Sequence, residues 1–544
     1  MNVIEIFQES ARQHATQVAI VSGRAGRERS IVFGELDRRS RQIAALLLQE
    51  GLRPGDAVVV LVPMSPQLYA IMAALLRLGM VPVFAEPAAL RETLGRALSS
   101  LRVRGFVGIP AACAARLLIP ELRRIQRVFV AGTFFPGAVS LRAAGTLAPS
   151  EHLEATAADA PAILTFTSGS TGRPKGVLRS HGVLADTHRI LSAHLGLMPG
   201  GLDVAVLPIV VFANLGAGVG SLIPDADLTR PGAIDPTRLA RQIDALSPDG
   251  IVASPALLER LADEALSRGA HFGSLRRVFA GGAPVFPRVL DKLAAVAPAA
   301  CIHALYGASE AEPMAVLTCD EFGAEERSAM HLGKGLLAGR PVPELQMRIL
   351  RDRFGETCGP WTLAQFDAAR AGPQEVGEIV VSGAHVVASY LGGEGDLEHK
   401  IRVGPDTWHR TGDAGWLDVS GRLWLGGRCA ARIEDSHGRR YPLAVDAALS
   451  DNAALSRATL IRHRDSVLLV VEARSPSDEE TLAAIGRAMA WAGADQVVAI
   501  RRFPMDRRHN AKIDYPRLQR MLDEERWWMR VPITETMAAQ GGSR

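Results

Sequence analysis

The chain has 544 residues, of which 48% are hydrophobic and 22% are charged. This is the composition of a folded globular protein, and the length favours about two to four domains over a single core. The 61 lysines and arginines nearly balance the 58 aspartates and glutamates, which leaves a net charge of +3. We therefore expect no nucleic-acid partner, because such partners select for a strongly basic surface.

Five cysteines form an odd set without a Cys-x-x-Cys pair, which argues against a disulfide framework and against a zinc site. A reducing, cytoplasmic location is expected. Residues 1–20 contain no basic region followed by an apolar core, so no signal peptide is predicted. The longest apolar runs, such as Ala57–Met64, are far shorter than the roughly 20 residues of a membrane span, and no transmembrane segment is expected.

Strand-like runs alternate with helix-like segments between Ile31 and Leu305, which predicts an α/β fold with mixed, largely parallel sheets flanked by helices. Beyond Gly377, shorter alternating strands predict a β-rich subdomain. The final part of the chain predicts a small, mobile α+β domain, with strands at 466–473 and 496–500 and a helix over 479–492. The glycine pair at 426 and 427 allows a free backbone turn. We place a boundary there, with a large domain over residues 1–427 and a small domain over residues 428–544.

Residues 165–176 read Thr-Phe-Thr-Ser-Gly-Ser-Thr-Gly-Arg-Pro-Lys-Gly. Gly169, Gly172 and Gly176 permit positive φ, so consecutive N–H groups can converge on an anion, while the hydroxyls and Lys175 add donors and charge. An apolar run before the loop predicts a strand, and open α/β sheets bind ligands at the carboxyl ends of strands. The loop is not a P-loop, because no hydroxyl follows Lys175 to ligate magnesium. Taken alone, it is also compatible with a flexible surface loop.

Four further motifs accompany this loop. Tyr306-Gly307-Ala308-Ser309-Glu310 places a carboxylate beside an aromatic ring and a hydroxyl, and Trp408–Asp413 ends on an acidic residue after a glycine turn, a geometry that can grip ribose hydroxyls. Gly421–Arg428 is a strand that ends on an arginine, and Asp506–Ile513 presents a lysine in a polar turn. Each motif alone is modest, and their order along the chain is what makes them specific.

The loop and the four motifs resemble, in this order, the adenylate-forming superfamily of acyl-CoA synthetases, peptide-synthetase adenylation domains and luciferases. The resemblance extends over nearly the whole chain and implies an AMP-forming ligase that uses ATP and Mg²⁺ to activate a carboxylic acid. It implies catalytic roles for Thr167, Lys175, Glu310 and Lys512, with Glu310 as the metal-binding residue. It implies nucleotide binding by Thr165, Ser168, Gly169, Ser170, Thr171, Gly172, Gly282, Ala283, Pro284, Tyr306, Gly307, Ser309, Asp413 and Arg428.

The physical chemistry of that reaction agrees with these residue types. A carboxylate that attacks the α-phosphorus of ATP brings two anions together, so catalysis depends on positioning and on charge neutralisation by a metal ion and a lysine. No protein nucleophile is needed. Lys512 matches the family's lysine that swings into the site for the adenylation step.

The chain departs from the family pattern in places that concern the acyl substrate and the hinge. Val211 stands where many relatives carry a histidine, and Ala430 stands at a hinge position that is usually aspartate or lysine. An apolar wall at residues 210–212, with small residues beyond it, suits an aliphatic acyl chain better than an amino acid. Segment His331–Leu337 does not clearly fit the branch of the family that the chain resembles most.

Ile223–Pro231 and Asp506–Ile513 resemble the β-lactone synthetases of olefin biosynthesis. In that branch a long-chain β-hydroxy acid is adenylated and closed by its own hydroxyl. The first functional prediction is transfer of a fatty-acyl adenylate to coenzyme A or to a carrier-protein thiol, and β-lactone formation without coenzyme A is the alternative. No carrier segment is visible, so any carrier protein acts in trans. A nucleotide-binding scaffold without turnover is the alternative from another class.

Overall fold

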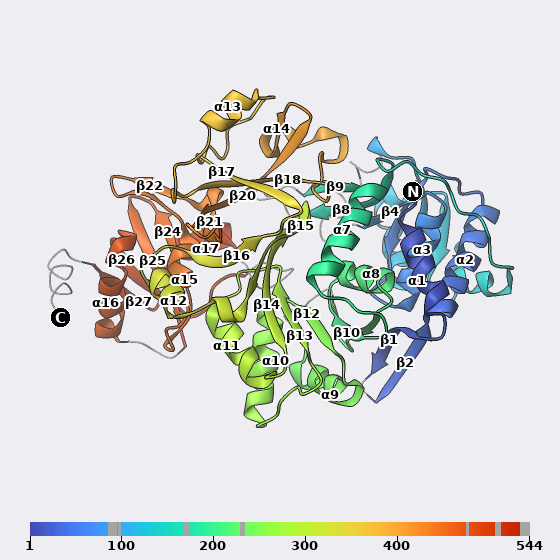
Figure 1. The fold of residues 1–544 in the computed structure, drawn as a ribbon, viewed down its shortest axis with the longest axis horizontal. Helices are drawn as coiled ribbons and strands as arrows, with labels where there is room; N and C mark the ends of the chain where they lie inside the picture. Colours follow the sequence, from blue (N-terminus) through green and yellow to red (C-terminus); the bar gives the residue numbers. More distant parts are fainter. Residues whose placement is uncertain are drawn as a thin grey trace.

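The computed structural model describes residues 1–24, 26–84, 95, 99–167, 174–228, 234–474, 478–505 and 513–533 (Figure 1). Seen as in Figure 1, the N-terminal helices and strands lie on the right and a small C-terminal sheet lies on the left, with a long sheet between them. Of the motif residues that the structure describes, Lys175, Tyr306, Glu310, Asp413 and Arg428 lie near one another where these parts meet.

A seven-stranded sheet is built from residues between Ala57 and Ser180. Its strands in spatial order are β7 (Val139–Ser140), β6 (Arg127–Val130), β5 (Val103–Gly108), β3 (Ala57–Leu61), β4 (Val81–Phe84), β8 (Pro161–Thr167) and β9 (Lys175–Ser180). All neighbours pair in parallel except β8 and β9, which form an antiparallel hairpin. The uninterrupted valines of β3 are buried, as expected for a parallel strand covered on both faces.

A second, fourteen-stranded sheet contains a parallel half and an antiparallel half. The parallel half comprises β1 (Val18–Arg24), β11 (Gly220–Ile223), β10 (Leu202–Ala205), β12 (Gly250–Ala253), β13 (Arg277–Gly281) and β14 (Cys301–Ala308), with β2 (Arg27–Val32) antiparallel at its edge. Helices α8 (Pro208–Gly216), α9 (Pro236–Leu246), α10 (Pro255–Ser267) and α11 (Pro287–Val296) connect these strands. Each of these four helices begins with proline, which fits the first helical turn because its N–H has no intrahelical partner there.

The antiparallel half continues the same sheet beyond β14. Its strands are β15 (Ala311–Thr318), β16 (Leu336–Pro341), β21 (Leu423–Arg428), β20 (Asp406–Leu417), β18 (Gly377–Gly383) and β17 (Leu345–Leu350), with β19 (Lys400–Val403) beside β20. The predicted β-rich subdomain is therefore continuous with the large sheet, and one hydrophobic cluster runs through both halves. Short alternating strands in the sequence do not reveal this continuity, because it depends on the pairing of β15 with β16.

The other helices of the large part cover these sheets or close loops between strands. They are α1 (Ile4–Gln13), α2 (Phe33–Gln49), α3 (Pro66–Arg77), α5 (Pro110–Arg116), α6 (Pro120–Arg123), α7 (His181–His194), α12 (Ala324–His331), α13 (Leu363–Ala368) and α14 (Asp396–His399). Apolar faces of α1, α2, α3 and α8 meet in one buried cluster between the two sheets. This cluster fixes the position of the seven-stranded sheet relative to the long one.

A separate four-stranded sheet forms the C-terminal part, in the order β24 (Leu455–His463), β25 (Ser466–Ala473), β26 (Gln496–Ile500) and β27 (Met529–Pro532). Its helices are α15 (Pro442–Ala448), α16 (Glu479–Ala488) and α17 (Tyr515–Asp523), and a short hairpin of β22 (Ile433–Asp435) and β23 (Gly438–Arg440) precedes them. The sequence predicts β25 and β26 with the observed bounds. The helix predicted over 479–492 ends at Ala488, and Gly493 then turns the chain at φ 55°.

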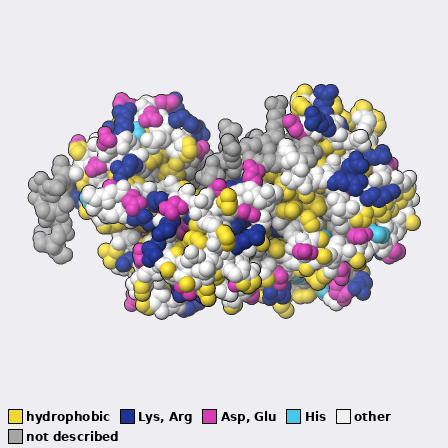
Figure 2. Space-filling model, turned by 90° about the horizontal axis from the view of Figure 1, so that it is seen from above, with side chains coloured by type: hydrophobic (Ala, Val, Ile, Leu, Met, Phe, Trp, Pro, Cys, Tyr) yellow, Lys and Arg dark blue, Asp and Glu magenta, His cyan; other side chains and the backbone are white. Residues whose placement is uncertain are grey.

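Acidic and basic side chains are interspersed over the face seen in Figure 2, in keeping with the near balance of charges in the composition. Among the described residues, no helix combines the length and the apolar character that crossing a membrane requires.

Candidate active site

The hairpin of β14 and β15 carries two of the predicted site residues. β14 is the last parallel strand of its row, and its carboxyl end lies at the edge where parallel sheets bind ligands. Tyr306 stands near that end, and Glu310 lies in the two-residue turn before β15. Gly307 allows the strands to approach closely here, because a Cβ at this position would lie 3.2 Å from the Ala311 carbonyl oxygen.

Tyr306, Asp413 and Arg428 form one connected group. The Tyr306 hydroxyl donates a hydrogen bond to Asp413 Oδ2 at 2.9 Å, and the Arg428 guanidinium lies 3.1 Å from Asp413 Oδ1. Asp413 and Arg428 are direct partners across β20 and β21, so sheet register sets their pairing. Burial, and then the Asp413 charge, raises the pKa of Tyr306 well above its ordinary value, which keeps its hydroxyl a donor.

Glu310, Tyr390 and Lys175 form a second group beside the first. The Tyr390 hydroxyl donates to Glu310 Oε1 at 2.8 Å, and Lys175 Nζ lies 5.5 Å from the centre of the Tyr390 ring. Lys175 is only 9% exposed. Burial lowers its pKa, and the negative charges of Glu310 and Glu398 oppose that shift. The predicted metal-binding carboxylate and the predicted phosphate-binding lysine thus face one tyrosine.

Arg179 ties the β8–β9 hairpin to the turn that carries Glu310. Its guanidinium donates to Thr165 Oγ1 at 3.1 Å and to the Ser309 carbonyl oxygen at 2.6 Å. Sequence reasoning did not select Arg179, which follows the glycine- and hydroxyl-rich loop within β9. Its double contact fixes the distance between the two hairpins.

Gly282, Ala283 and Pro284 follow the carboxyl end of β13, on the same sheet edge as Tyr306. Gly282 has φ +84° and is exposed, and a Cβ there would meet nothing within 4 Å. Open space therefore borders this turn, and a turn that lies beside a bound nucleotide needs such space.

Several predicted site residues lie outside the described residues: Ser168, Gly169, Ser170, Thr171, Gly172 and Lys512, together with the side chain of Thr167. The Thr167 backbone pairs with Lys175 where the β8–β9 hairpin opens into the loop. Gly176 corrects part of the loop prediction, because it lies in β9 and is not among the glycines with positive φ. It is needed for packing instead, since a Cβ there would lie 2.8 Å from Leu391 Cβ.

The residues present fit a magnesium nucleotide. Within the described ranges, no group of three or more His, Cys, Asp or Glu side chains gathers to hold a metal ion. Mg²⁺ is usually held by one or two carboxylates together with substrate phosphates and water, so it does not need an all-protein cage. A half-buried Glu310 beside a lysine and a hydroxyl-rich hairpin matches that mode of binding.

Residues 7–391 match the family model described as AMP-binding enzyme. The chain belongs to the AMP-binding enzyme family. An olefin beta-lactone synthetase of Stenotrophomonas maltophilia is 33% identical over 550 residues, which cover 95% of this chain and 97% of that protein. Family and relative together make this chain an AMP-forming ligase.

Two solved structures share the fold of this AMP-binding enzyme. The amide bond synthetase McbA of Marinactinospora thermotolerans superposes with a TM-score of 0.76 at 21% identity, over 95% of this chain and 99% of that one. The o-succinylbenzoate coenzyme A synthetase MenE of Bacillus subtilis, solved in complex with ATP and magnesium ion, gives 0.73 at 20% identity, over 93% and 97%. At such identities the likeness concerns the fold, and it confirms the predicted architecture.

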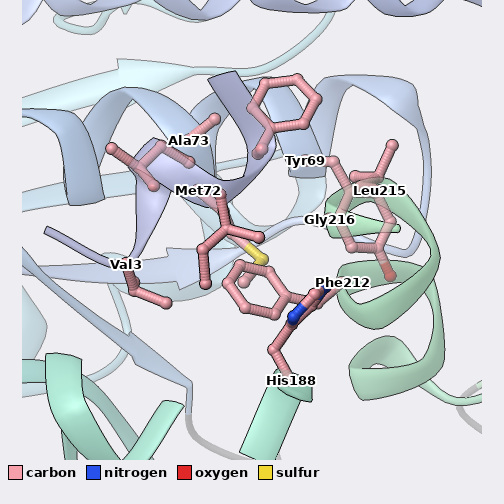
Figure 3. A pocket seen from close by; sticks show the side chains of 11 residues that line it. Val3, Tyr69, Met72, Ala73, His188, Phe212, Leu215 and Gly216 are labelled. Carbon is pink, nitrogen blue, oxygen red and sulfur yellow. The ribbon is translucent and has the colours of Figure 1, made fainter. Parts of the chain in front are cut away.

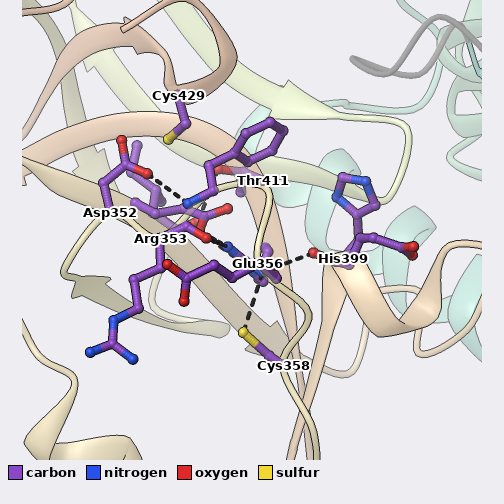
Figure 4. A network of polar contacts seen from close by, with 12 residues as sticks. Asp352, Arg353, Glu356, Cys358, His399, Thr411 and Cys429 are labelled. Atoms are coloured by element: carbon purple, nitrogen blue, oxygen red, sulfur yellow. Dashed lines mark hydrogen bonds and ion pairs between the residues drawn. The ribbon is translucent and has the colours of Figure 1, made fainter. Parts of the chain in front are cut away.

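Arg410 supports the strand on which this AMP-binding enzyme carries Asp413. Its side chain is 2% exposed and pairs with Glu378 at 2.7 Å. It also donates to the carbonyl oxygens of Arg353, Glu356 and Glu398 and to Cys358 Sγ (Figure 4). Arg410 lies within the motif at 408–413, whose pattern gives no sign of this supporting role. Its contacts with backbone groups from separate loops fix the base of β20.

Lys400 is a further residue that the sequence did not reveal. It follows Glu398 and His399 in what looks like a solvated charged run, yet its side chain is 4% exposed. Its ammonium donates to the Val387 carbonyl oxygen and lies 5.0 Å from the centre of the Tyr390 ring. Burial lowers the pKa of Lys400 to about 8, against the attraction of Glu310 and Asp396.

A small apolar cavity lies between α1, α3, α7 and α8, where Tyr69, Met72, His188 and Phe212 point toward one another (Figure 3). Its volume is about 20 Å³, which is roughly the space of one water molecule. Residues 210–212 divide between two environments because they lie on different faces of α8. The first two are buried in the core, and only Phe212 lines the cavity.

Ala430 lies exposed in the short turn Cys429–Ala431 that follows β21. Segment 331–337, which does not clearly fit the branch that the chain resembles, contains the end of α12 and the start of β16. Within it, Gly333 has φ +81° and faces the Trp491 ring of the C-terminal part, so a Cβ there would lie 2.6 Å from that ring. This segment is therefore part of the contact between the large part and the C-terminal sheet.

Proposed function

We propose that this enzyme converts a β-hydroxy fatty acid to its acyl adenylate with ATP and Mg²⁺, releases pyrophosphate, and closes the product to a β-lactone. The observation that carries the proposal is the 33% identity to an olefin beta-lactone synthetase over 95% of the chain. The likeness to a synthetase solved with ATP and magnesium ion supports the nucleotide and the metal. Transfer to coenzyme A or to a carrier-protein thiol, the first prediction from sequence, becomes the alternative.

The two groups of residues bind different parts of the nucleotide, and the first group binds the nucleoside. Asp413 accepts hydrogen bonds from ribose hydroxyls, and Tyr306, held by Asp413, packs beside the adenine next to the open space at Gly282. Arg428 neutralises Asp413 and presents a cation to the nucleotide. These contacts orient the α-phosphorus without taking part in bond breaking.

The second group, Glu310, Tyr390 and Lys175, binds the polyphosphate. Thr165 and Lys175 bind phosphate oxygens together with the hydroxyl-rich loop, and Glu310 holds Mg²⁺. When bound, the metal ion neutralises charge that develops on the leaving pyrophosphate. Lys512 supplies an ammonium group near the α-phosphate and the attacking carboxylate.

The two chemical steps balance without a protein nucleophile. First, a carboxylate oxygen of the substrate forms a bond to the α-phosphorus, and the bond from that phosphorus to the pyrophosphate oxygen breaks. Next, the β-hydroxyl oxygen of the same substrate attacks the acyl carbon, the bond to the AMP oxygen breaks, and the hydroxyl proton is lost. The sum is a four-membered lactone, AMP and pyrophosphate, and the acid has lost one water.

The small C-terminal domain is proposed to turn between these steps. Its four-stranded sheet is separate from the long sheet, and Arg428, at the proposed boundary, is held by Asp413 of the large part. Lys512 belongs to this domain, so the domain would hold it at the acid during adenylation and carry it away in the turn that follows. An aliphatic tail is proposed from the apolar composition of α8, in which Ile209 and Phe212 are only partly buried.

Exchange of labelled pyrophosphate into ATP tests the adenylation step. We expect exchange that depends on long-chain β-hydroxy acids and on Mg²⁺, with weaker exchange for plain fatty acids of the same length. Silence with β-hydroxy, fatty and aryl acids alike would reject the proposal. A non-catalytic scaffold would bind ATP and give no exchange with any acid.

A further inference from the structure

The segment from Val387 to Tyr390 grips Glu310 at two points. The Val387 N–H donates to the Glu310 carbonyl oxygen at 2.8 Å, and the Tyr390 hydroxyl donates to Glu310 Oε1, also at 2.8 Å. One contact fixes the backbone of the turn and the other fixes its carboxylate. Among the described residues, no hydrogen bond reaches the second carboxylate oxygen, Oε2, which is left for another ligand.

Lys400 braces this segment from the other side. Its ammonium donates to the carbonyl oxygen of Val387, the residue whose N–H holds Glu310, and it lies 5.0 Å from the centre of the Tyr390 ring. Lys400 begins β19 and pairs with His409 of β20. It therefore connects the strand that carries Asp413 to the segment that holds Glu310.

Asp396 also holds the segment from Val387 to Tyr390 in place. Its Oδ1 accepts a hydrogen bond from the Tyr390 N–H at 2.9 Å, and its Oδ2 accepts one from the Ser389 hydroxyl. Tyr390 is 4% exposed and lies within reach of two ammonium groups, because Lys175 Nζ is 5.5 Å from the same ring centre. The aromatic ring attracts both cations while its hydroxyl is committed to Glu310.

Burial of Lys400 calls for an explanation beyond packing. Lysine is rarely fully buried unless it is paired, because an ammonium removed from water without a carboxylate partner costs stability. Within the described part of the chain, Lys400 has a carbonyl and a ring as partners and forms no ion pair, although Glu310 and Asp396 attract it from farther away. An apolar side chain would fill this space at lower cost.

We infer that Lys400 and Tyr390 are positioning residues that hold the Glu310 carboxylate in the orientation in which its Oε2 binds a divalent cation. This inference rests on the proposed role of Glu310 in binding the metal of the nucleotide. Hydrogen-bond partners of metal ligands orient those ligands, and their loss typically lowers metal affinity by about 10- to 100-fold. Neither Lys400 nor Tyr390 needs to touch the nucleotide to have this effect.

The test compares Lys400→Met, Tyr390→Phe and the double variant with wild type. Lys400→Met keeps the volume and removes the charge, and Tyr390→Phe keeps the ring and removes the hydroxyl. Lys334→Met is the matched control, because the exposed Lys334 also lies over an aromatic ring, 5.9 Å from the centre of Trp416. Manganese(II) binding with a non-hydrolysable ATP analogue is measured by electron paramagnetic resonance, and the Mg²⁺ dependence of pyrophosphate exchange is measured in parallel.

We expect the manganese dissociation constant and the half-saturating Mg²⁺ concentration to rise about 10-fold or more in each single variant. The double variant should bind manganese no more weakly than the single variant with the lower affinity, because both substitutions act through the Glu310 carboxylate. The thermal midpoint of Lys400→Met should equal or exceed that of wild type, because a buried charge has been removed. Lys334→Met should match wild type throughout.

Unchanged manganese affinity in Lys400→Met or in Tyr390→Phe would overturn the inference, as would additive losses in the double variant. A lower thermal midpoint with unchanged metal affinity would assign Lys400 a purely structural role. Failure of the proposed function has a different signature: the wild-type protein would then show no acid-dependent exchange, while the manganese measurements would still separate the variants.

Discussion

The Tyr306 hydroxyl donates a hydrogen bond to Asp413 Oδ2 at 2.9 Å, which joins residues 107 positions apart in the chain. Tyr306 precedes the turn that carries Glu310, and Asp413 is paired with Arg428. One hydrogen bond therefore couples the candidate nucleotide-binding carboxylate to the hairpin of the candidate metal ligand.

Replacement of Asp413 by alanine should weaken ATP binding. The variant removes the acceptor for ribose hydroxyls and leaves Tyr306 and Arg428 without their partner, and hydrogen bonds to charged groups are worth about 1.5–3 kcal/mol. We expect the KM for ATP in pyrophosphate exchange to rise by about 10- to 100-fold. Asp406→Asn, an exposed change at the start of the same strand, is the control. An unchanged KM in Asp413→Ala would remove Asp413 from the nucleotide site.

Lys512→Ala should slow adenylation while leaving ATP affinity nearly unchanged. Removal of one donor that stabilises developing charge typically costs on the order of 10²–10³ in rate. Single-turnover formation of pyrophosphate measures this step directly. Arg517→Ala, an exposed change in α17, serves as the control for loss of a nearby positive charge. A loss of less than about 10-fold would argue that Lys512 is not the catalytic ammonium.

Arg410→Met should destabilise the protein strongly. The change leaves Glu378, itself 2% exposed, as an uncompensated buried charge, which typically costs about 3–5 kcal/mol. Urea unfolding followed by tryptophan fluorescence should show the loss. Because replacing both members of a buried pair is often nearly neutral, the double variant Arg410→Met with Glu378→Leu should recover much of it. Equal stability of Arg410→Met and wild type would show that the pair contributes little.

Stability should fall in mild acid partly because of His181. Its ring is buried and accepts a hydrogen bond from the Val3 N–H at 3.1 Å, and burial lowers its pKa to about 4. An unfolded histidine titrates near pH 6.5, so this contribution is complete above that pH and is lost as the pH falls toward 4.

Between about pH 7 and pH 4.5, wild type should lose about 2 kcal/mol more unfolding free energy than His181→Asn. Asparagine can still accept the hydrogen bond from Val3 and cannot take up a proton in this range. Urea titrations of both proteins at the two pH values measure the difference. Parallel losses in the two proteins would contradict the assignment.

The sequence predicted elements whose signal is local. The strand at 466–473 combines an apolar run with a turn on either side, and it appears with the predicted bounds. Motif order along the chain assigns Tyr306, Asp413 and Arg428 to one site, and in the structure these three residues are in contact. Tyr306 lies near the carboxyl end of the last parallel strand, where such sheets bind ligands, whereas the register of the antiparallel strands β20 and β21 pairs Asp413 with Arg428.

The residues that sequence reasoning missed depend on long-range packing. Lys400 stands in a charged run that would ordinarily face solvent, and only the pairing of β19 with β20 buries it against Tyr390. Gly176 belongs to a glycine-rich motif. It must be glycine because Leu391, far along the chain, packs against it and leaves no room for a Cβ. Composition and spacing contain no signal for either contact.

Product analysis of a single turnover tests the central claim most directly. The enzyme is supplied with ATP, Mg²⁺ and a long-chain β-hydroxy acid whose carboxylate is labelled with heavy oxygen, with and without coenzyme A, and the products are analysed by mass spectrometry. We predict one labelled oxygen in AMP. In the absence of any thiol, we also predict an acyl product that keeps the other labelled oxygen and has the composition of the acid minus one water. Unlabelled AMP, or an acyl product that appears only with coenzyme A, would contradict it.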